Sequence, residues 1–345
     1  NDNVNVNVIT FANEQLFALT ETNLLCRLDP HTLEILETMD IVRQLPFHNA
    51  TMLAHPQLEP DGSWINAGMN VRNKWRPSYN FFRFNNRNAS SNKNLFDSVD
   101  LIASLASSHR FKLSYFHSFG LTKHYIVFIE QSLLFSFKNV LKAALFNRPI
   151  SSAIVRDPSI KTRIHLIEKS SGRLVDQKFS STPICFFHVI NCFEKERQVI
   201  IDICAYGAND LQIDKFTYKQ MFRAESFGSS HVKSTPVRYT LSLDKNAAAK
   251  SEQFVEPIYL NRDVSLEMPM IDYANCNGQE YNYVYGLNIY ESPIAVVKLN
   301  VSNPSCYLQR RYSCDEGNKE LPSEPIFVAK PVSYTHLAGD SQMTL

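Results

Sequence analysis

The chain has 345 residues, of which 44 % are hydrophobic, so it is long enough to bury a substantial core. Its 35 basic and 34 acidic side chains leave a net charge of +1, which excludes a general attraction to nucleic acid or acidic membranes. Seven cysteines lie far apart without a Cys-x-x-Cys pair, which argues against a zinc ribbon or a disulfide framework and predicts reduced thiols.

Most of the chain alternates between apolar and polar residues, which predicts half-buried strands. The first meander is expected over residues 4–9, 16–20, 24–28 and 33–39, with a turn at Asn13-Glu14. Later hairpins pair residues 163–168 with 174–179, 185–193 with 198–204, and 283–290 with 295–299. Repeated short hairpins predict a β-propeller or a β-sandwich, and no strict sequence repeat chooses between them. Because no domain-length linker interrupts the pattern, we expect a single domain.

One segment, residues 131–146, has apolar residues near helical spacing and is predicted to be a helix. No apolar run is long enough to span a bilayer. The chain opens with Asn1-Asp2-Asn3 inside a strand-like pattern and without a signal peptide, so we expect the natural N-terminus to lie upstream.

Three of the ten histidines stand among apolar or aromatic neighbours, which predicts buried imidazoles: His55, His117 and His188. A buried imidazole needs a hydrogen-bonding partner or a metal. For any one of them, a core histidine with its hydrogen bonds satisfied is the commoner case. Three such histidines on strand-like segments favour a shared metal site without establishing it.

Several motifs follow one another along the chain as far as Pro331. They are Leu19-Thr20-Glu21-Thr22-Asn23, Leu28-Asp29-Pro30-His31-Thr32-Leu33-Glu34, Ala54-His55-Pro56, Phe116-His117-Ser118-Phe119-Gly120-Leu121-Thr122, Phe187-His188-Val189-Ile190-Asn191 and Glu324-Pro325-Ile326-Phe327-Val328. In order and spacing they resemble the carotenoid cleavage oxygenases, and more closely the animal branch of β-carotene oxygenases and the retinal pigment epithelium retinoid isomerase.

The resemblance implies an all-β fold, a seven-bladed β-propeller that is incomplete in this chain, with few short helices. In that family four histidines bind Fe2+ on the propeller axis, and three are matched here by His55, His117 and His188. Glutamates that accept hydrogen bonds from the ligand imidazoles are matched by Glu21, Glu267 and Glu324. A carboxylate on the far ring nitrogen fixes the tautomer and aims the other nitrogen at the metal. Thr20 matches a threonine beside the open iron position.

The chain also departs from the family pattern. The fourth histidine is expected well beyond Glu324, and the late His336 is too close and lacks a following glycine, so we do not assign it as a ligand. The usual His-Pro-His reads His55-Pro56-Gln57. We therefore expect a partial oxygenase domain over residues 1–331 and an atypical, disordered tail over 332–345. Lacking one ligand, this piece is expected to be inactive or nearly so.

The function implied is an iron(II)-dependent dioxygenase that splits a conjugated double bond of a carotenoid with O2 and gives aldehydes, retinal or an apocarotenal. Three alternatives stay open: a retinoid isomerohydrolase on the same scaffold, a non-catalytic carotenoid-binding or truncated, inactive homologue, and, with less support, a generic propeller interaction module. The expected partners are a carotenoid or retinoid and O2, and no nucleic acid. Residues 131–146 either pack on the sheets or contact a membrane surface, so the expected location is cytoplasmic, with peripheral membrane contact as the open question.

Overall fold

The structure is a computed structural model that describes residues 4, 6–11, 15–72, 75–86, 95–148, 150–207, 233–243, 252–289, 294–311 and 323–329. Within these residues the chain is mostly β-strand with few short helices, as predicted. It divides into two compact units. Unit 1 comprises Asn1–Phe119, Leu133–Asp157 and Leu166–Val175, and unit 2 comprises Gly120–Ser132, Pro158–His165 and Asp176–Leu345. The single domain expected over 1–331 stays a prediction, and the tail 332–345 lies outside the described residues.

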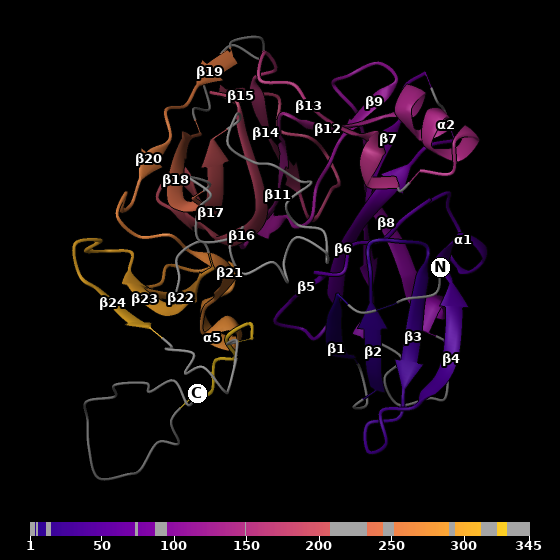
Figure 1. Ribbon diagram of the computed structural model, residues 1–345, viewed down its shortest axis with the longest axis horizontal. Coiled ribbons are helices and arrows are strands. Elements are labelled where there is room, and N and C mark those ends of the chain that lie inside the picture. The colour runs from indigo at the N-terminus through magenta and orange to yellow at the C-terminus, as the bar shows by residue number, and fades with distance from the viewer. Residues whose placement is uncertain are drawn as a thin grey trace. The chain divides into compact units, whose positions relative to one another are not determined.

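Unit 1 contains three antiparallel sheets (Figure 1). Sheet A is the expected first meander, with β1 (Asn7–Phe11), β2 (Gln15–Leu19), β3 (Leu24–Leu28) and β4 (Ile35–Asp40) in chain order. Sheet B has β5 (Gln57–Leu58), β6 (Trp64–Asn70), β7 (Ser78–Phe84) and β8 (Val99–Ala106). Sheet C places β12 (Leu133–Ser136) between β9 (Lys112–Ser114) and β13 (Ile154–Arg156). The short helices are α1 (Ile41–Gln44), η2 (Leu95–Ser98), α2 (Phe137–Leu145) and η3 (Ile150–Ala153).

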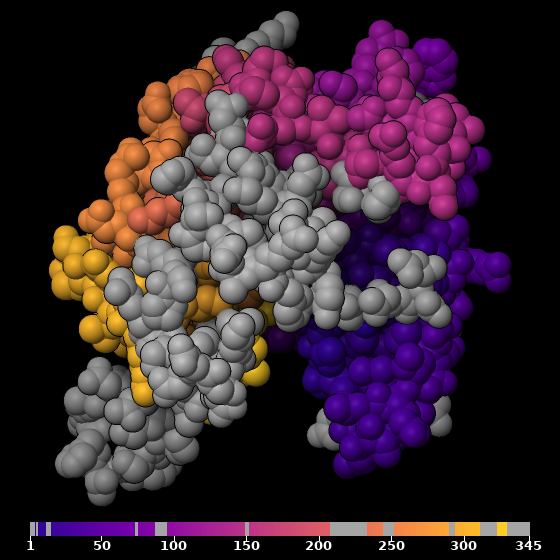
Figure 2. Space-filling view, viewed as in Figure 1, coloured from indigo at the N-terminus to yellow at the C-terminus, as the bar shows by residue number. Residues whose placement is uncertain are grey.

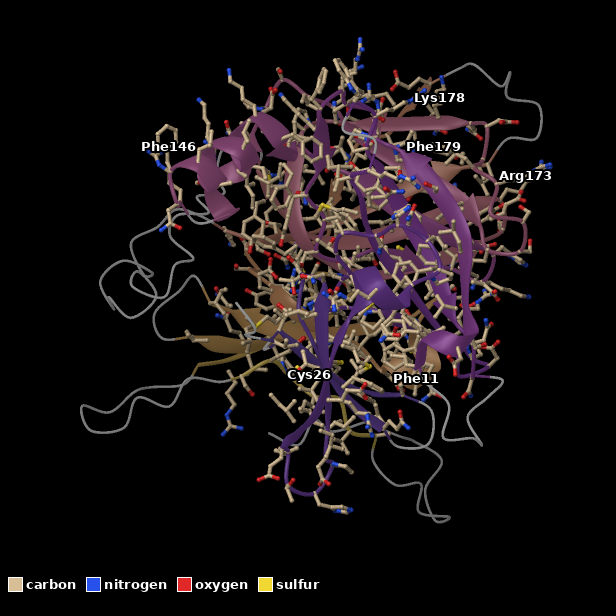
Figure 3. All side chains as sticks on the ribbon, turned by 90° about the vertical axis from the view of Figure 1, so that its right-hand side faces the viewer. Phe11, Cys26, Phe146, Arg173, Lys178 and Phe179 are labelled. Carbon is tan, nitrogen blue, oxygen red and sulfur yellow. The ribbon has the colours of Figure 1, made fainter. Side chains whose placement is uncertain are left out.

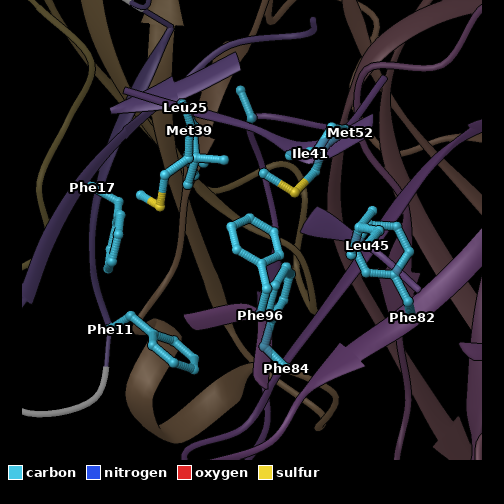
Figure 4. Packing of buried hydrophobic residues seen from close by; sticks show 12 residues of the cluster. Phe11, Phe17, Leu25, Met39, Ile41, Leu45, Met52, Phe82, Phe84 and Phe96 are labelled. Carbon is cyan, nitrogen blue, oxygen red and sulfur yellow. The ribbon is translucent and has the colours of Figure 1, made fainter. Parts of the chain in front are cut away.

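One core cluster of unit 1 joins residues from sheets A and B. Figure 4 shows its aromatic and aliphatic side chains facing one another, with Phe17 from β2 and Phe82 from β7 among them. The register pairs Ile9 with Phe17, so Ile9 packs against this core while Val8 stays 55 % exposed. Val8, one of the apolar residues whose alternation predicted this strand, therefore faces outward. The same cluster includes Ala54, the residue directly before His55.

Unit 2 also contains three sheets. Sheet D orders β10 (Gly120–Leu121), β11 (Tyr125–Glu130), β14 (Thr162–Glu168, whose last three residues belong to unit 1), β15 (Lys178–Ser181) and β19 (Glu252–Phe254). Sheet E has β16 (Ile184–Lys195), β17 (Gln198–Gly207), β18 (Thr235–Ser242) and β20 (Ile258–Tyr259). Sheet F has β21 (Glu267–Met270), β22 (Tyr283–Asn288), β23 (Ala295–Asn300) and β24 (Tyr307–Arg311), with the helix α5 (Tyr273–Cys276) between β21 and β22.

The hairpins predicted in this part of the chain are present as β14–β15, β16–β17 and β22–β23. Aliphatic side chains from sheets E and F pack together in one cluster that includes Ile200, Val284 and Val297. None of the sheets built from the described residues closes on itself. In the same residues every cysteine is a free thiol, as predicted, and Cys314 lies outside them.

The helix expected over residues 131–146 is wrong in its first half. Residues 133–136 form β12, which pairs with β9 and β13, and the helix begins only at Phe137. A short apolar run does not separate strand from helix by its spacing, and here the pairing with two neighbouring strands decides. No helix among the described residues is long and apolar enough to cross a membrane.

A buried ion pair ties two strands of sheet E together. Asp202 on β17 is fully buried and accepts two hydrogen bonds from Arg238 on β18, at 2.8 Å from Nε and 2.7 Å from Nη2. Tyr281 donates its hydroxyl to the same carboxylate at 2.7 Å. Burial and the negative charge of Asp202 raise the pKa of Tyr281 well above its usual value, so it remains a donor.

Replacing Arg238 by methionine should cost about 3–5 kcal/mol of unfolding free energy, because the Asp202 charge would be left buried without its partner. Denaturant unfolding followed by circular dichroism measures the loss. Lys195→Met is the control, since Lys195 and Glu280 form an exposed pair, 53 % and 58 % accessible, whose loss should cost at most about 1 kcal/mol. Equal losses for the two variants would contradict the assigned role of the buried pair.

Candidate functional site

His55 stands at the end of a segment, residues 48–54, that runs alongside β6 in unit 1. The amides of Ala50 and Leu53 donate to carbonyls of β6 at 2.7 and 3.0 Å. The buried Asn66 side chain donates to the Leu53 carbonyl at 3.0 Å. A Cβ at Gly68 would lie 2.0 Å from a backbone oxygen of this segment, so only glycine permits the close approach. These contacts hold the backbone that leads into His55.

His117 lies in the loop between β9 and β10. Its neighbour Phe116 points into the core, where its ring meets Tyr79 edge-on at 5.4 Å. Because side chains alternate along an extended chain, Tyr115 and His117 share the opposite side. There the ring centroid of His117 lies 4.5 Å from that of His55. Unit 1 therefore brings two of the three predicted histidines together.

Glu21 contacts both residues on that side of the chain. Its Oε1 is hydrogen-bonded to Nδ1 of His117, and its Oε2 accepts the Tyr115 hydroxyl at 2.9 Å. Burial, with the charge of Glu21, raises the pKa of Tyr115 well above its usual value, so the hydroxyl stays a donor. With Nδ1 of His117 bound to Glu21, Nε2 is the ring nitrogen that would ligate a metal.

His188 lies at a β-bulge in β16 of unit 2. Phe186 pairs with Ala205 and Val189 with Ile203, so Phe187 and His188 together stand opposite the single residue Cys204. A bulge of this kind bends the strand and redirects a side chain. Here the redirected side chain is the imidazole of His188.

Glu267, the first residue of β21, binds the redirected imidazole. Its Oε2 lies 2.6 Å from Nδ1 of His188 and accepts the Met268 amide at 3.0 Å, while Oε1 accepts the Tyr206 hydroxyl at 2.5 Å. Both carboxylate oxygens thus accept from other donors, so Nδ1 of His188 carries the proton and donates. Burial, then the charges of Glu267 and Asp202, raise the pKa of Cys204 well above its usual value.

The two units therefore carry the same arrangement, a tyrosine hydroxyl and a histidine Nδ1 on the two oxygens of one glutamate. The histidines and glutamates were predicted from the motifs, and the tyrosines were not. Tyr115 could have been found, because it precedes His117 by two residues on a strand-like segment. Tyr206 carries no such signal, since it lies 61 residues from Glu267 in sequence.

For the other two predicted site residues, Thr20 and Glu324, the structure gives the position and the exposure. Thr20 is buried, 8 % accessible, directly after β2 and before Glu21. Glu324 is exposed, on a segment that contacts sheet F through Phe327, whose ring lies 5.9 Å from that of Tyr285. The expected orientation of Glu324 toward the place of the missing fourth ligand, whose imidazole it would accept a hydrogen bond from, stays a prediction. His336 lies outside the described residues.

The fold and these histidine–glutamate pairs agree with the class of oxygenases that the motifs predicted. The family described as retinal pigment epithelial membrane protein (RPE65) matches residues 1–337. The chain belongs to this family, the carotenoid cleavage oxygenases, as its motifs predicted.

Individual relatives agree with this assignment. The mitochondrial carotenoid-cleaving dioxygenase of Homo sapiens is 29 % identical over 360 residues, which cover 96 % of this chain and 60 % of the relative. The β,β-carotene 15,15'-dioxygenase of Rattus norvegicus is 28 % identical over 355 residues, 96 % of this chain and 61 % of the relative. The chain thus spans less than two thirds of the length of these relatives.

Solved structures share the fold. Cobalt-substituted Synechocystis ACO superimposes with a TM-score of 0.72 at 20 % identity, covering 96 % of this chain and 63 % of that one. A chimera of ACO and RPE65 gives a TM-score of 0.71 at the same identity and coverage.

Replacing Glu267 by alanine should release the proton of His188 from Nδ1 and leave the ring as a mixture of tautomers. Long-range nitrogen–proton correlation spectra of histidine-labelled, metal-free protein report which ring nitrogen is protonated. Glu59→Ala is the control, because Glu59 pairs with Lys169 and Arg83 in unit 1 and contacts no histidine. An unchanged His188 signal in Glu267→Ala would show that the carboxylate does not set the tautomer.

Proposed function

We propose that this chain is the metal-binding part of an iron(II)-dependent dioxygenase that cleaves a conjugated double bond of a carotenoid with O2 and yields aldehydes, retinal or an apocarotenal. The observation that carries the proposal is the engagement of Nδ1 by a carboxylate in both His117 and His188. A carboxylate on Nδ1 is the arrangement that orients a metal-ligating imidazole, with Nε2 as the ligand atom.

The donor set fits ferrous iron. Neutral imidazoles suit Fe2+ and leave coordination positions for small molecules when few other ligands bind. We propose that His55, His117 and His188 hold the metal together through ring nitrogens, with the two histidines of unit 1 contributing as a pair. Fe2+, when bound, supplies the activation of O2.

The surrounding residues act on the ligands. Glu21 and Glu267 hold the Nδ1 protons of their histidines, and Tyr115 and Tyr206 hold the glutamates in place by donating to the second oxygen. Hydrogen bonds of this kind fix the orientation of the imidazole ring and raise the basicity of its other nitrogen. Thr20 is proposed to limit access to an open metal position, because it is buried beside Glu21.

The proposed architecture is a seven-bladed β-propeller of which this chain supplies a part. The six sheets have three to five strands each, and those of sheets A, B and F run in chain order. Small antiparallel sheets in sequence are what propeller blades consist of. A propeller also suits ligands gathered from several sheets, because the inner ends of blades meet on one axis.

The substrate class rests on the relatives. The human and rat proteins are named for carotenoid cleavage and for β,β-carotene, and the solved Synechocystis neighbour is an apocarotenoid oxygenase. A retinoid isomerohydrolase on the same scaffold would use the same histidines, so product analysis separates the two activities. A non-catalytic carotenoid binder would bind pigment and leave it unchanged.

Membrane contact is proposed for α2 and the residues beside it in unit 1, from the cytoplasmic side. Leu141, Leu145 and Phe146 are 61–70 % exposed, and Figure 3 shows Phe146 pointing away from the ribbon at the end of α2. In the space-filling view α2 stands at the surface of unit 1 (Figure 2). Apolar side chains flanked by the exposed Lys138 and Lys142 fit the interface of a bilayer. A lipophilic polyene has to leave a membrane to reach the metal.

A second exposed aromatic pair extends this surface. Trp75 and Phe111 are 66 % and 43 % exposed and their rings lie 5.0 Å apart. Phe111 is next to the helix, because its carbonyl accepts the Phe137 amide at 3.3 Å. Tryptophan and phenylalanine are favoured at membrane interfaces.

The metal assignment predicts that His55→Ala, His117→Ala and His188→Ala each weaken Fe2+ binding by at least about tenfold. Iron content after anaerobic loading and gel filtration measures the loss. His165→Ala is the control, since His165 pairs with Glu130 at 2.9 Å in a different arrangement, with the carboxylate on Nε2. Full iron content in all three variants would overturn the metal site.

The activity is tested by incubating the chain, and any longer natural form of the protein, with Fe2+ and β-carotene under 18O2. The expected result is labelled aldehydes from the longer form, lost in its histidine variants, and little or no product from the chain itself. Retinol formed from a retinyl ester without O2 would replace the proposal by the isomerohydrolase. Bound but unchanged pigment in every form would replace it by a binding protein.

The membrane proposal predicts that Leu141→Gln, Leu145→Gln and Phe146→Gln each weaken binding to phosphatidylcholine vesicles, by roughly tenfold per inserted side chain. Cosedimentation with the vesicles measures this. Leu308→Gln in unit 2 is the matched control, because Leu308 is 70 % exposed but lies on β24. Equal weakening by the control would contradict the assignment of this surface.

A further inference from the structure

We propose that Gln131 is a positioning residue for His188. Its side-chain amide holds the backbone of β16 directly before the bulge that redirects the imidazole. The consequence for metal binding rests on the proposed function, whereas the consequence for the position of His188 does not.

The strand that carries His188 is an edge strand. β16 is the first strand of sheet E and pairs only with β17 in that sheet. Every second residue of an edge strand turns its N–H and C=O away from its partner, and buried groups of this kind need other hydrogen bonds. Along β16 these residues include Ile184 and Phe186.

The N–H and C=O groups of β16 that point away from β17 bond to side chains of β14 in sheet D and of residues 131–132, which follow β11. The Ile184 amide donates to Thr162 Oγ1 at 3.2 Å, and the Ile184 carbonyl accepts from Ser132 Oγ at 2.9 Å. At Phe186 one side chain does both tasks: the Phe186 amide donates to Gln131 Oε1 at 2.7 Å, and Gln131 Nε2 donates to the Phe186 carbonyl at 2.9 Å. The carboxamide of Gln131 thus takes the place of a neighbouring strand for one residue.

This contact is specific to a carboxamide. The Phe186 backbone offers one donor and one acceptor, so the orientation of the Gln131 amide is determined, and the carboxamide supplies both partners from adjacent atoms. Gln131 is completely buried, so water does not substitute for it. An apolar residue of equal size would leave both Phe186 groups unpaired.

The position of the contact relates it to His188. The bulge begins at the next residue, where Phe187 and His188 face Cys204. A one-residue slip in register moves every side chain of a strand to the other face. Fixing the amide and carbonyl of Phe186 therefore fixes where the bulge starts and to which side His188 points.

The strand is packed closely beyond the bulge as well. A Cβ at Gly120 would lie 2.2 Å from Cys192 Sγ and 3.4 Å from Val189 Cγ1. Gln131 contacts β16 just before the residues whose register is irregular, and Gly120 lies against the strand at and after them.

The test compares Gln131→Met and Gln131→Glu with the unaltered chain. Methionine keeps the volume and removes both hydrogen bonds, whereas glutamate keeps an acceptor for the Phe186 amide and has a donor only in its protonated form, which burial favours. We expect faster hydrogen exchange at Phe186 and a changed ring-nitrogen spectrum of His188 in metal-free protein. Co2+ affinity should fall by at least about tenfold in Gln131→Met and by less in Gln131→Glu.

Two controls separate positioning from general loss of stability. Gln177→Met removes a glutamine that donates to the Ser242 carbonyl at 2.9 Å. Leu241→Ala opens a cavity at a fully buried position of β18 and lowers the unfolding temperature. Both controls should keep the His188 spectrum and the Co2+ affinity of the unaltered chain.

The outcomes distinguish this inference from the proposed function. An unchanged His188 spectrum in folded Gln131→Met overturns the positioning role, as does an equal change in Leu241→Ala. If the unaltered chain binds no Co2+, the proposed metal site fails, while the metal-free spectrum still decides the role of Gln131.

Discussion

The hydrogen bond between a glutamate and Nδ1 of a histidine is the constraint around which both units are arranged. It decides which ring nitrogen remains basic, and it needs a carboxylate held within hydrogen-bonding distance of a ring that cannot rotate freely. Glu21 meets this need in the turn between β2 and β3, and Glu267 meets it at the start of β21. The burial of the surrounding strands serves to keep these two pairs in place.

The two units reach this arrangement by different local structures. In unit 1, an extended segment beside β6 leads to His55, and a loop with alternating side chains presents His117. In unit 2, a bulge in a long strand presents His188. A bulge interrupts the ladder and has to be held from outside the pair of strands, which gives the buried carboxamide of Gln131 its importance. A tyrosine completes each pair, so neither carboxylate depends on its histidine alone.

Membership of the carotenoid cleavage oxygenases explains why polar networks are buried in an otherwise apolar fold. Burying a carboxylate is costly unless several donors compensate it. Glu267 has three such donors, from Tyr206, His188 and its own neighbour Met268. Asp202 has a comparable set of donors, but they come from an arginine and a tyrosine, so that cluster joins strands and contains no imidazole. The kind of partner, more than burial itself, distinguishes the two carboxylates.

The amino-acid sequence by itself determined the strand content, the main hairpins, and the histidine and glutamate candidates. Alternation along the chain is a local property, and the motifs around His55, His117 and His188 are contiguous in sequence. Contacts between distant residues decided the rest. Residues 133–136 became a strand because β9 and β13 pair with them, and Val8 faces outward because Ile9 is the residue in register with Phe17. Tyr206 and Gln131 gained their roles from partners 61 and 55 residues away, which no local pattern encodes. A hydrogen bond depends on the positions of two atoms in space, and the chain brings such atoms together only when its sheets have formed.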